Sequence, residues 1–386
     1  MRVFLIAIVV AGCAAQPAGI FSGVREHPAI GYETRPLHDS IARLNRKLGD
    51  GEIKLDFDGP SGYLRSVLDA LAIPVESQIA VFSKTSLQAQ IISPQNPRTI
   101  FFNDSTAVAW VHGEPFVEAA TQDPEQGMIF YVLSQSPAAR PQFLRSDGQC
   151  LRCHENYSTL GVPGTLLRSV YPAVTGLPYR SMGDHASDHR TPFAERWGGW
   201  YVTGKFEPVQ HMGNTVFFDP ENPASRRSLA VKIDPSVYLS PYSDVVALMV
   251  FEHQMHAMNL LTRFNWEMRW SAYEHKPFDM HAEAKELADY LLFVGEPPLP
   301  GKLEGLSGFT EKFAARGPLR EFDLKTRLMK NRCSYMIESE AFDALPKAAR
   351  VAVYRAMREV LAARGDLEEI AAILRKAKPE AWDYLR

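Results

Sequence analysis

The feature that most constrains this chain is a five-residue segment near its middle, Cys150-Leu151-Arg152-Cys153-His154. The 386 residues include four cysteines, and two of them stand here, separated by two residues and followed directly by a histidine. In a chain of this composition, roughly 0.001 such matches are expected by chance. The segment therefore indicates a site that uses both sulfurs and the imidazole together.

The pattern Cys-x-x-Cys-His is that of c-type haem attachment. The two thiols add across the two vinyl groups of a haem, and the two intervening residues allow both sulfurs to reach them. The imidazole of His154 then lies under the iron and serves as the proximal ligand through a neutral ring nitrogen. The sequence thus predicts one covalent haem c, held by Cys150, Cys153 and His154.

Three other interpretations stay open for the same residues. Zinc could bind Cys150, Cys153 and a histidine, but the sequence lacks the second Cys-x-x-Cys pair that is typical of a structural zinc site. A thioredoxin-like redox pair needs a βαβ setting that the surrounding sequence does not show. A local disulfide between Cys150 and Cys153 would make the chain a non-haem exported binding module.

The first 20 residues have the anatomy of an export signal. Arg2 precedes an apolar stretch at residues 3–10 that is too short to span a bilayer. Residues 10–13 (Val-Ala-Gly-Cys) resemble the bacterial lipobox, in which Cys13 would become a lipidated N-terminus. We expect a periplasmic or otherwise extracytoplasmic protein, either anchored to a membrane by lipid on Cys13 or released by simple cleavage.

With an export signal and a single Cys-x-x-Cys-His segment, the chain resembles the c-type cytochromes. The resemblance covers only those five residues and the signal, and the surrounding sequence does not fit the small all-helical cytochrome fold. It implies haem c and, as partner, a redox protein or a small-molecule redox ligand. The balance of 42 basic against 45 acidic residues gives a net charge of −3, which argues against nucleic-acid binding.

Hydrophobic periodicity predicts an α+β fold, in which an antiparallel sheet carries the haem-binding loop and a mostly helical region follows. Residues 37–48 and 63–71 are expected to form helices. Short β-rich segments separated by Asn, Asp, Gly and Pro fill residues 78–135, and strand-like segments return at 166–174 and 196–206. The sheet is therefore expected to be interrupted by the motif, in a polar loop, and to resume after it.

From about residue 244 the pattern becomes helical to the end of the chain. Helices are expected at 244–273, 281–293, 321–338, 347–363 and 367–377, with a Pro- and Gly-rich linker at 295–301. We divide the chain into a signal at 1–20, an α+β haem-c-binding domain at 25–240 and a helical region at 241–386.

The ligand on the opposite face of the iron separates the functional hypotheses, because two protein ligands suit electron transfer whereas an open face permits gas binding or peroxide chemistry. His253 shares one face of an expected helix with His256, and we rank His253 first. His211, in a loop rich in Gly and Asn, ranks second. The alternative for the helix histidines is a hydrogen-bonded pair at an interface. The predicted metal ligands are thus His154 and His253.

Other residues after the motif fit a haem environment without being specific to it. Further candidates from a polar loop are Met182, His185 and His189. Arginines that could pair with the haem propionates are Arg168, Arg180, Arg190 and Arg196. Aromatic residues that could pack on a porphyrin or form plain core are Trp197, Trp200 and Tyr201. Cys333 is expected to be a buried free thiol, with pairing to Cys13 as the alternative if Cys13 is not lipidated.

The leading hypothesis is a periplasmic monohaem c-type cytochrome that transfers electrons through its covalently bound haem. The alternative is a haem-dependent oxidoreductase, or a gas or redox sensor, with an open face on the iron. The length and the mixture of sheet and helices favour the alternative, since 386 residues is much protein for one electron carrier. No catalytic motif stands near the segment, so the sequence leaves open whether the chain is an enzyme.

Overall fold

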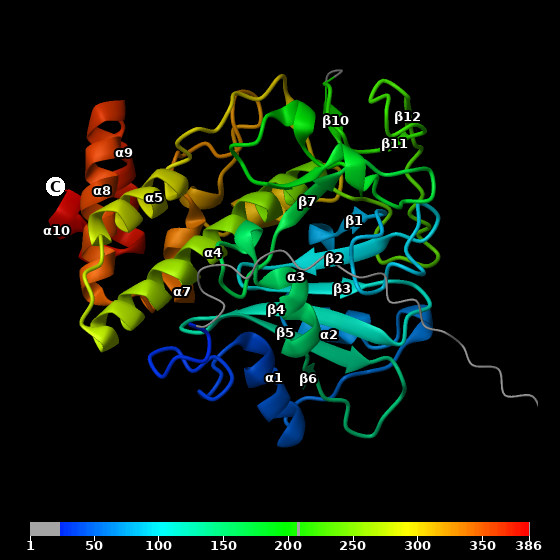
Figure 1. The fold of residues 1–386 in the computed structure, drawn as a ribbon, viewed down its shortest axis with the longest axis horizontal. Coiled ribbons are helices and arrows are strands. Elements are labelled where there is room, and N and C mark those ends of the chain that lie inside the picture. The colour runs from blue at the N-terminus through cyan, green and yellow to red at the C-terminus, as the bar shows by residue number, and fades with distance from the viewer. Residues whose placement is uncertain (1–23, 207–208, 386) are drawn as a thin grey trace, which may run out of the picture.

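A seven-stranded antiparallel sheet with strand order β6-β5-β4-β3-β2-β1-β9 forms the centre of the computed structural model, which describes residues 24–206 and 209–385 (Figure 1). The strands are β1 Ile79–Val81, β2 Arg98–Phe102, β3 Thr106–Trp110, β4 Phe116–Asp123, β5 Gly127–Ser134, β6 Leu144–Arg145 and β9 Trp200–Tyr201. The predicted α+β fold is confirmed. The expected signal and the lipobox at Cys13 lie outside the described residues.

Along the strands, buried side chains alternate with partly exposed ones, so the two faces of the sheet differ. In β4, Val117 and Ala119 are fully buried on one face, whereas Glu118 and Ala120 are partly exposed on the other. The sheet resumes after the motif, as expected, because β9 pairs with β1 and sets Tyr201 opposite Ala80. Residues from both sides of the motif therefore belong to one sheet.

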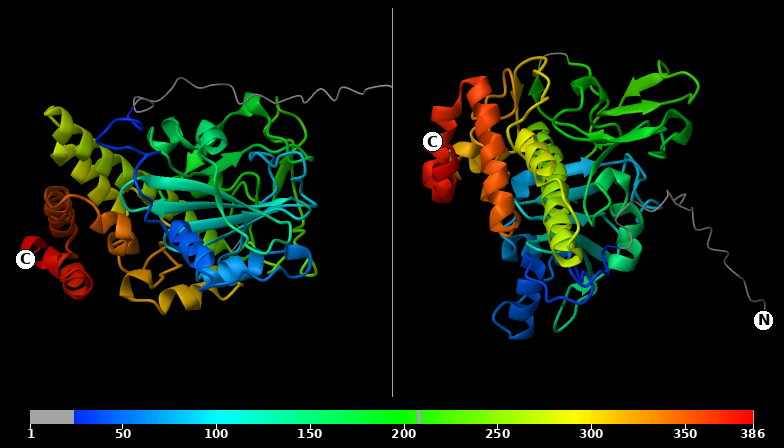
Figure 2. Two further views of the ribbon diagram at one scale, coloured as in Figure 1. Left: turned by 90° about the horizontal axis from the view of Figure 1, so that it is seen from below. Right: turned by 60° about the vertical axis from the view of Figure 1, so that its left-hand side comes forward.

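The helix α1 (Ser40–Gly49) lies on one face of the sheet, on the opposite side from the motif helix (Figure 2). It starts later than the expected residue 37 because the side chain of Asp39 accepts hydrogen bonds from the backbone N–H groups of Ile41 and Ala42. The hydroxyl of Tyr131 in β5 donates to the same carboxylate at 2.9 Å. The second predicted helix is α2, Leu64–Ala70.

The motif lies in a short helix, α3 (Asp147–His154), rather than in the polar loop that we expected. That expectation was wrong because α3 has no amphipathic pattern to detect: within it only Leu151 is buried. The helix is held instead by its packing on the sheet, where the ring of His154 lies 4.9 Å from that of Phe130 in β5.

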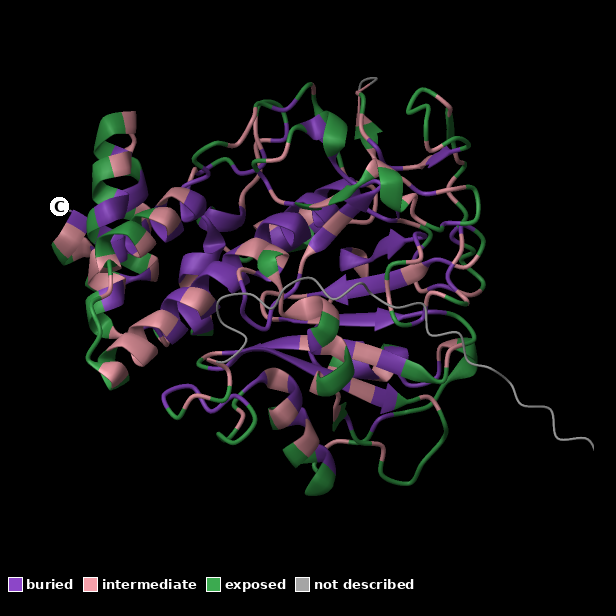
Figure 3. Cartoon of the chain, in the orientation of Figure 1, coloured by how far each residue is buried: buried purple, intermediate pink, exposed green. Residues whose placement is uncertain are grey.

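The 30-residue helix α4 (Val245–Glu274) covers the same face of the sheet as α3. The ring of Phe251 lies 4.9 Å from that of Phe102 in β2, and the amide of Gln122 in β4 donates to the hydroxyl of Thr262 at 3.0 Å. Most of α4 is buried (Figure 3). The residues on either side of position 240 thus share one core, and our domain boundary there stays a prediction.

The helices after α4 are α5 Met280–Leu291, α6 Phe309–Ala314, α7 Glu340–Asp343, α8 Lys347–Arg364, α9 Leu367–Ala377 and α10 Trp382–Leu385. The helix expected at 321–338 was wrong. A carboxylate oxygen of Asp323 accepts hydrogen bonds from the N–H groups of Lys325, Thr326 and Arg327, which forms a turn there instead.

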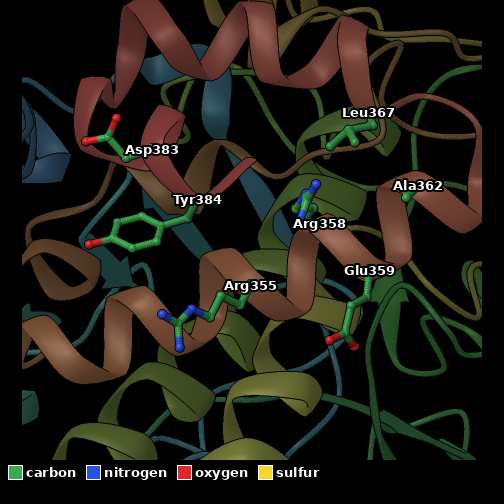
Figure 4. Close-up of a pocket in the computed structure, with 7 residues that line it drawn as sticks. All are labelled: Arg355, Arg358, Glu359, Ala362, Leu367, Asp383 and Tyr384. Carbon is green, nitrogen blue, oxygen red and sulfur yellow. The ribbon is translucent and has the colours of Figure 1, made fainter. Parts of the chain in front are cut away.

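Three two-stranded ribbons complete the fold: β7 Leu167–Val170 with β8 Asp184–Ser187, β10 Lys205–Phe206 with β13 Leu303–Glu304, and β11 Thr215–Phe217 with β12 Arg226–Ser228. A surface hollow of about 650 Å³ lies among α8, α9 and α10, lined by residues that include Arg355, Arg358 and Tyr384, well away from α3 (Figure 4). Within the described residues, no helix combines the length and the apolar character that crossing a bilayer requires.

The start of α4 generates a first prediction. One carboxylate oxygen of the buried Asp244 accepts from the N–H groups of Val246 and Ala247, and the other accepts from those of Leu306 and Ser307 at 2.6 and 2.9 Å. We expect Asp244→Ala to lower the free energy of unfolding by about 3 kcal/mol, because a helix cap and two further charge-assisted bonds are lost together. Denaturant titration measures this loss.

The matched control is Asp279→Ala at the start of α5. The exposed Asp279 caps with a single bond to the N–H of Ala282, so its loss should cost about 1 kcal/mol. Equal losses in the two variants would contradict the role assigned to Asp244.

Candidate functional site

Helix α3 brings together the three residues that the motif predicts to act together. Cys150 and Cys153 are one turn apart, and His154 follows Cys150 by four residues, so the three side chains share one side of the helix. All three are partly buried, and the ring of His154 packs on Phe130 in β5 of the sheet. Two sulfurs and an imidazole therefore lie close together on one side of α3.

The ring of His154 is held by a hydrogen bond to the backbone. Its Nδ1 lies 3.0 Å from the carbonyl oxygen of Gly164, and because a carbonyl can only accept, Nδ1 carries the proton. The Nε2 atom therefore keeps its lone pair. Burial lowers the pKa of His154 to about 4, with smaller contributions from the charges of Arg98 and Arg168, so the ring is neutral at neutral pH. A neutral imidazole of fixed tautomer is the form that binds a metal.

The thiol of Cys150 is protonated at neutral pH. Burial, together with the nearby charge of Glu118, raises the pKa of Cys150 to about 11. Reactive redox cysteines have the opposite shift, so this environment does not favour thiolate exchange. Cys150 and Cys333 are both free thiols, and burial raises the pKa of Cys333 to about 12. The expectation of a buried free thiol at Cys333 is thus confirmed.

The sheet face next to α3 suits a flat ring system. Ala107 in β3 pairs with Ala120 in β4, and Ala109 pairs with Glu118, so small side chains line this part of the face. A guanidinium nitrogen of Arg98 forms an ion pair with Glu118 at 2.6 Å. The Nε of Arg98 is buried and has no hydrogen-bond partner within the described part of the chain.

These features fit a haem. Methyl-lined surface accommodates a porphyrin plane, and arginine pairs well with carboxylates such as the propionates. Arg98 and Arg168 are both close enough to His154 to affect its pKa. Arg168 was among the predicted propionate partners. Arg98 precedes the motif by some fifty residues, and no sequence signal connected Arg98 with the motif.

His253 lies in a different buried cluster. Its Nδ1 is 2.8 Å from Nδ1 of His189, and its Nε2 is 2.6 Å from the hydroxyl of Ser334. The ring stacks on those of Tyr290 and Phe293. Both ring nitrogens of His253 are thus engaged, and the structure resembles the alternative of a hydrogen-bonded histidine pair, although the partner is His189 rather than His256.

Helical geometry also separates His253 from the motif. Met255 and Asn259 on α4 contact Thr165, next to the carbonyl that holds His154. At 100° per residue, His253 lies on the opposite side of α4 from those two residues. The structure therefore does not bring the two predicted metal ligands together, and His253 as an iron ligand stays a prediction.

The remaining candidates have surroundings of their own. His211 packs against the rings of Phe193, Trp197 and Phe206, and burial lowers its pKa to about 4. Met182 and His185 stand at the β7–β8 ribbon. Trp200 uses its ring N–H to donate to the carbonyl of Arg168 at 2.9 Å, which ties β9 to β7.

Sequence reasoning missed a buried ionic cluster around α4. Arg196 and Glu252 form an ion pair at 3.2 Å, and both side chains are almost fully buried. Burial raises the pKa of Glu252 to about 7 despite the nearby Arg196. Arg190 pairs with Asp188 at 2.5 Å. Arg168 also forms an ion pair, with Asp184 at 3.5 Å, so three of the four predicted propionate partners are already paired with acidic side chains.

Comparison with known proteins finds no match: no family model, no curated protein and no solved structure corresponds to this chain. The geometry of the site is therefore the basis for its function. Three features matter most: the hydrogen bond of His154, the two neighbouring thiols and the small side chains of the adjacent sheet face.

The histidine pair generates a second prediction. Burial lowers the pKa values of His189 and His253 far below 6.5, the latter to about 3, whereas both take up a proton near pH 6.5 when the chain is unfolded. Their contribution to stability is thus present above pH 6.5 and is lost as the pH falls. Charged groups that act on the pair are Asp188, Arg190 and Arg196, and the titratable ring of His256 also lies close.

We expect His189→Phe to flatten the dependence of the unfolding free energy on pH between 6.5 and 5 by up to about 1.4 kcal/mol per pH unit, because one proton uptake is removed. Urea titrations at several pH values measure this slope. His281→Gln, at an exposed position of α5, is the control and should keep the parent slope. An unchanged slope in His189→Phe would show that His189 does not titrate as described.

Proposed function

We propose that this chain is a monohaem c-type cytochrome, in which Cys150 and Cys153 hold the haem by thioethers and His154 is the proximal ligand of the iron. The observation that carries the proposal is the bond from Nδ1 of His154 to the carbonyl of Gly164, which leaves the lone pair of Nε2 free on the turn that also bears both thiols. A bound haem would supply one-electron chemistry by cycling between Fe(III) and Fe(II).

The residues of the chain have separate tasks in this proposal. The thiols of Cys150 and Cys153 attach the group without any oxidant, because each S–H adds across a carbon–carbon double bond. The carbonyl of Gly164 orients the imidazole of His154 and makes it a stronger electron donor, which favours the oxidised metal. Arg98 and Arg168 would supply positive charge for the propionates, although each is also ion-paired, with Glu118 at 2.6 Å and with Asp184 at 3.5 Å.

The other interpretations of the motif have less support. Zinc binding and thiol–disulfide exchange both use thiolates, and the raised pKa of Cys150 opposes deprotonation at this position. The Cys150 thiol is free rather than bridged, so the local disulfide also lacks support.

We further propose that the protein works in the periplasm or elsewhere outside the cytoplasm, either held to a membrane by lipid on Cys13 or released by simple cleavage. The export signal and the lipobox-like residues 10–13 support this placement. The resemblance to c-type cytochromes implies the same location. The partner would be a redox protein or a small-molecule redox ligand.

A second candidate function is a haem enzyme or sensor with an open face on the iron. The observation that favours it is the engagement of both nitrogens of His253, by His189 and Ser334, which leaves neither for an iron held on His154. An exogenous ligand such as carbon monoxide could then bind opposite His154.

The main prediction concerns attachment. Full-length chain matured with the haem c attachment machinery should gain the mass of one haem that survives denaturation, and Cys150→Ser/Cys153→Ser should lose it, because both thioether sulfurs are gone. Intact-mass analysis measures the adduct. Cys333→Ser, at the buried free thiol, is the control and should keep the haem. A parent chain without adduct would refute the proposed function.

A further prediction separates the two candidate functions. If His253 is not an iron ligand, His253→Gln, which keeps a polar group beside Ser334, should leave the optical spectrum of the matured protein unchanged. Carbon monoxide binding to the reduced parent would favour the enzyme or sensor, and its absence would favour electron transfer. Conversion from low-spin to high-spin iron in His253→Gln alone would instead establish His253 as the second ligand.

A further inference from the structure

We infer that Asn259 on α4 is a positioning residue for the haem: through Thr165 and Gly164 it fixes the imidazole of His154 and thereby sets the reduction potential of the iron. The inference rests on the proposed function, and it assigns a role to a side chain that follows the motif by more than one hundred residues. It is carried by a continuous set of hydrogen bonds and one close approach.

The first step joins Asn259 to the backbone of Thr165. The side chain of Asn259 is 1 % exposed; its Oδ1 accepts from the N–H of Thr165 at 3.1 Å, and its Nδ2 donates to the carbonyl of Thr165 at 2.8 Å. Both polar backbone groups of one residue are thus satisfied by one amide. Such a pair of bonds fixes the position and the direction of the backbone at Thr165.

The second step joins Gly164, the neighbour of Thr165, to the motif. The N–H of Gly164 donates to the carbonyl of His154 at 2.8 Å, and the carbonyl of Gly164 accepts from Nδ1 of the same histidine at 3.0 Å. The backbone and the ring of His154 are therefore both bonded to Gly164. A displacement of Gly164 moves the imidazole with it.

The third step is the close approach of Asn259 to Gly164. A Cβ atom at position 164 would lie 2.2 Å from Oδ1 and 2.8 Å from Cγ of Asn259. Real Cβ atoms do not come so close, so only glycine permits the contact. The residue at 164 and the residue at 259 therefore depend on each other.

The helix that carries Asn259 is itself well anchored. The hydroxyl of Thr165 donates to the sulfur of Met255 at 2.7 Å, one turn before Asn259. At its start, α4 is capped by Asp244, which also binds the backbone at Leu306 and Ser307. A buried helix with these anchors gives rigid support to the hydrogen bond between His154 and the carbonyl of Gly164.

The test compares Asn259→Ala with Asn265→Ala in matured, haem-bearing protein. Asn265 is also buried on α4, but its amide donates to the carbonyl of Ala344, away from Thr165. Without Asn259, the bond from His154 to Gly164 weakens, the imidazole donates less to the iron, and the reduction potential rises. Redox titration followed in the haem spectrum should show this rise in Asn259→Ala and no shift in Asn265→Ala.

A second pair of variants approaches the contact from the other side. Gly164→Ala places a methyl group against Asn259 and should raise the potential in the same direction, whereas Gly148→Ala, at an open position of α3 with no atom within 4 Å of its Cβ, should not. This pair of variants tests the role of the contact between positions 164 and 259 even if Asn259→Ala does not fold. The potential is a property of the iron, so a general loss of stability would not by itself move it.

The outcomes distinguish the two levels of the account. A parent protein without covalent haem would refute the proposed function. A parent with haem, together with folded Asn259→Ala or Gly164→Ala variants at the parent potential, would refute the role of Asn259 and leave the proposed function standing. An equal shift in Asn265→Ala or Gly148→Ala would also refute it, because the effect would not be specific to the contact.

Discussion

The hydrogen bond between Nδ1 of His154 and the carbonyl of Gly164 is the interaction on which the functional account depends. It fixes the tautomer of the ring, so that Nε2 keeps its lone pair, whereas burial lowers the pKa of His154 and keeps the imidazole neutral. Two thiols on the same helical side convert this single ligand into a site for a covalently held group. The methyl-lined sheet face would give that group a surface, and Arg98, which is ion-paired with Glu118, would add positive charge beside it.

The architecture explains why so long a chain surrounds so short a motif. Helix α3 is too short and too polar to hold its own position, so the sheet supports it on one side and the loop before β7 on another. That loop depends in turn on α4, a helix from the part of the chain that we had assigned to a separate helical region. The C-terminal half thus contributes to the geometry of the site as well as to the core.

The sequence predicted what depends on local pattern. The motif residues are adjacent along the chain, and the strands and long helices show clear periodicity, so both could be found without a structure. Arg98, Gly164 and Asn259 could not be connected, because their contacts join positions far apart in sequence and carry no spacing signal. The helix at the motif was missed for lack of an amphipathic pattern, and His253 was ranked by helical spacing alone, which cannot show that its nitrogens are already hydrogen-bonded.

The most direct test of the account is a crystal structure of the full chain after maturation with haem. The account predicts continuous density from the sulfurs of Cys150 and Cys153 to the porphyrin, with Nε2 of His154 on the iron and its Nδ1 still bonded to the carbonyl of Gly164. Iron held by a different residue, or the two sulfurs joined to each other with no porphyrin present, would contradict it.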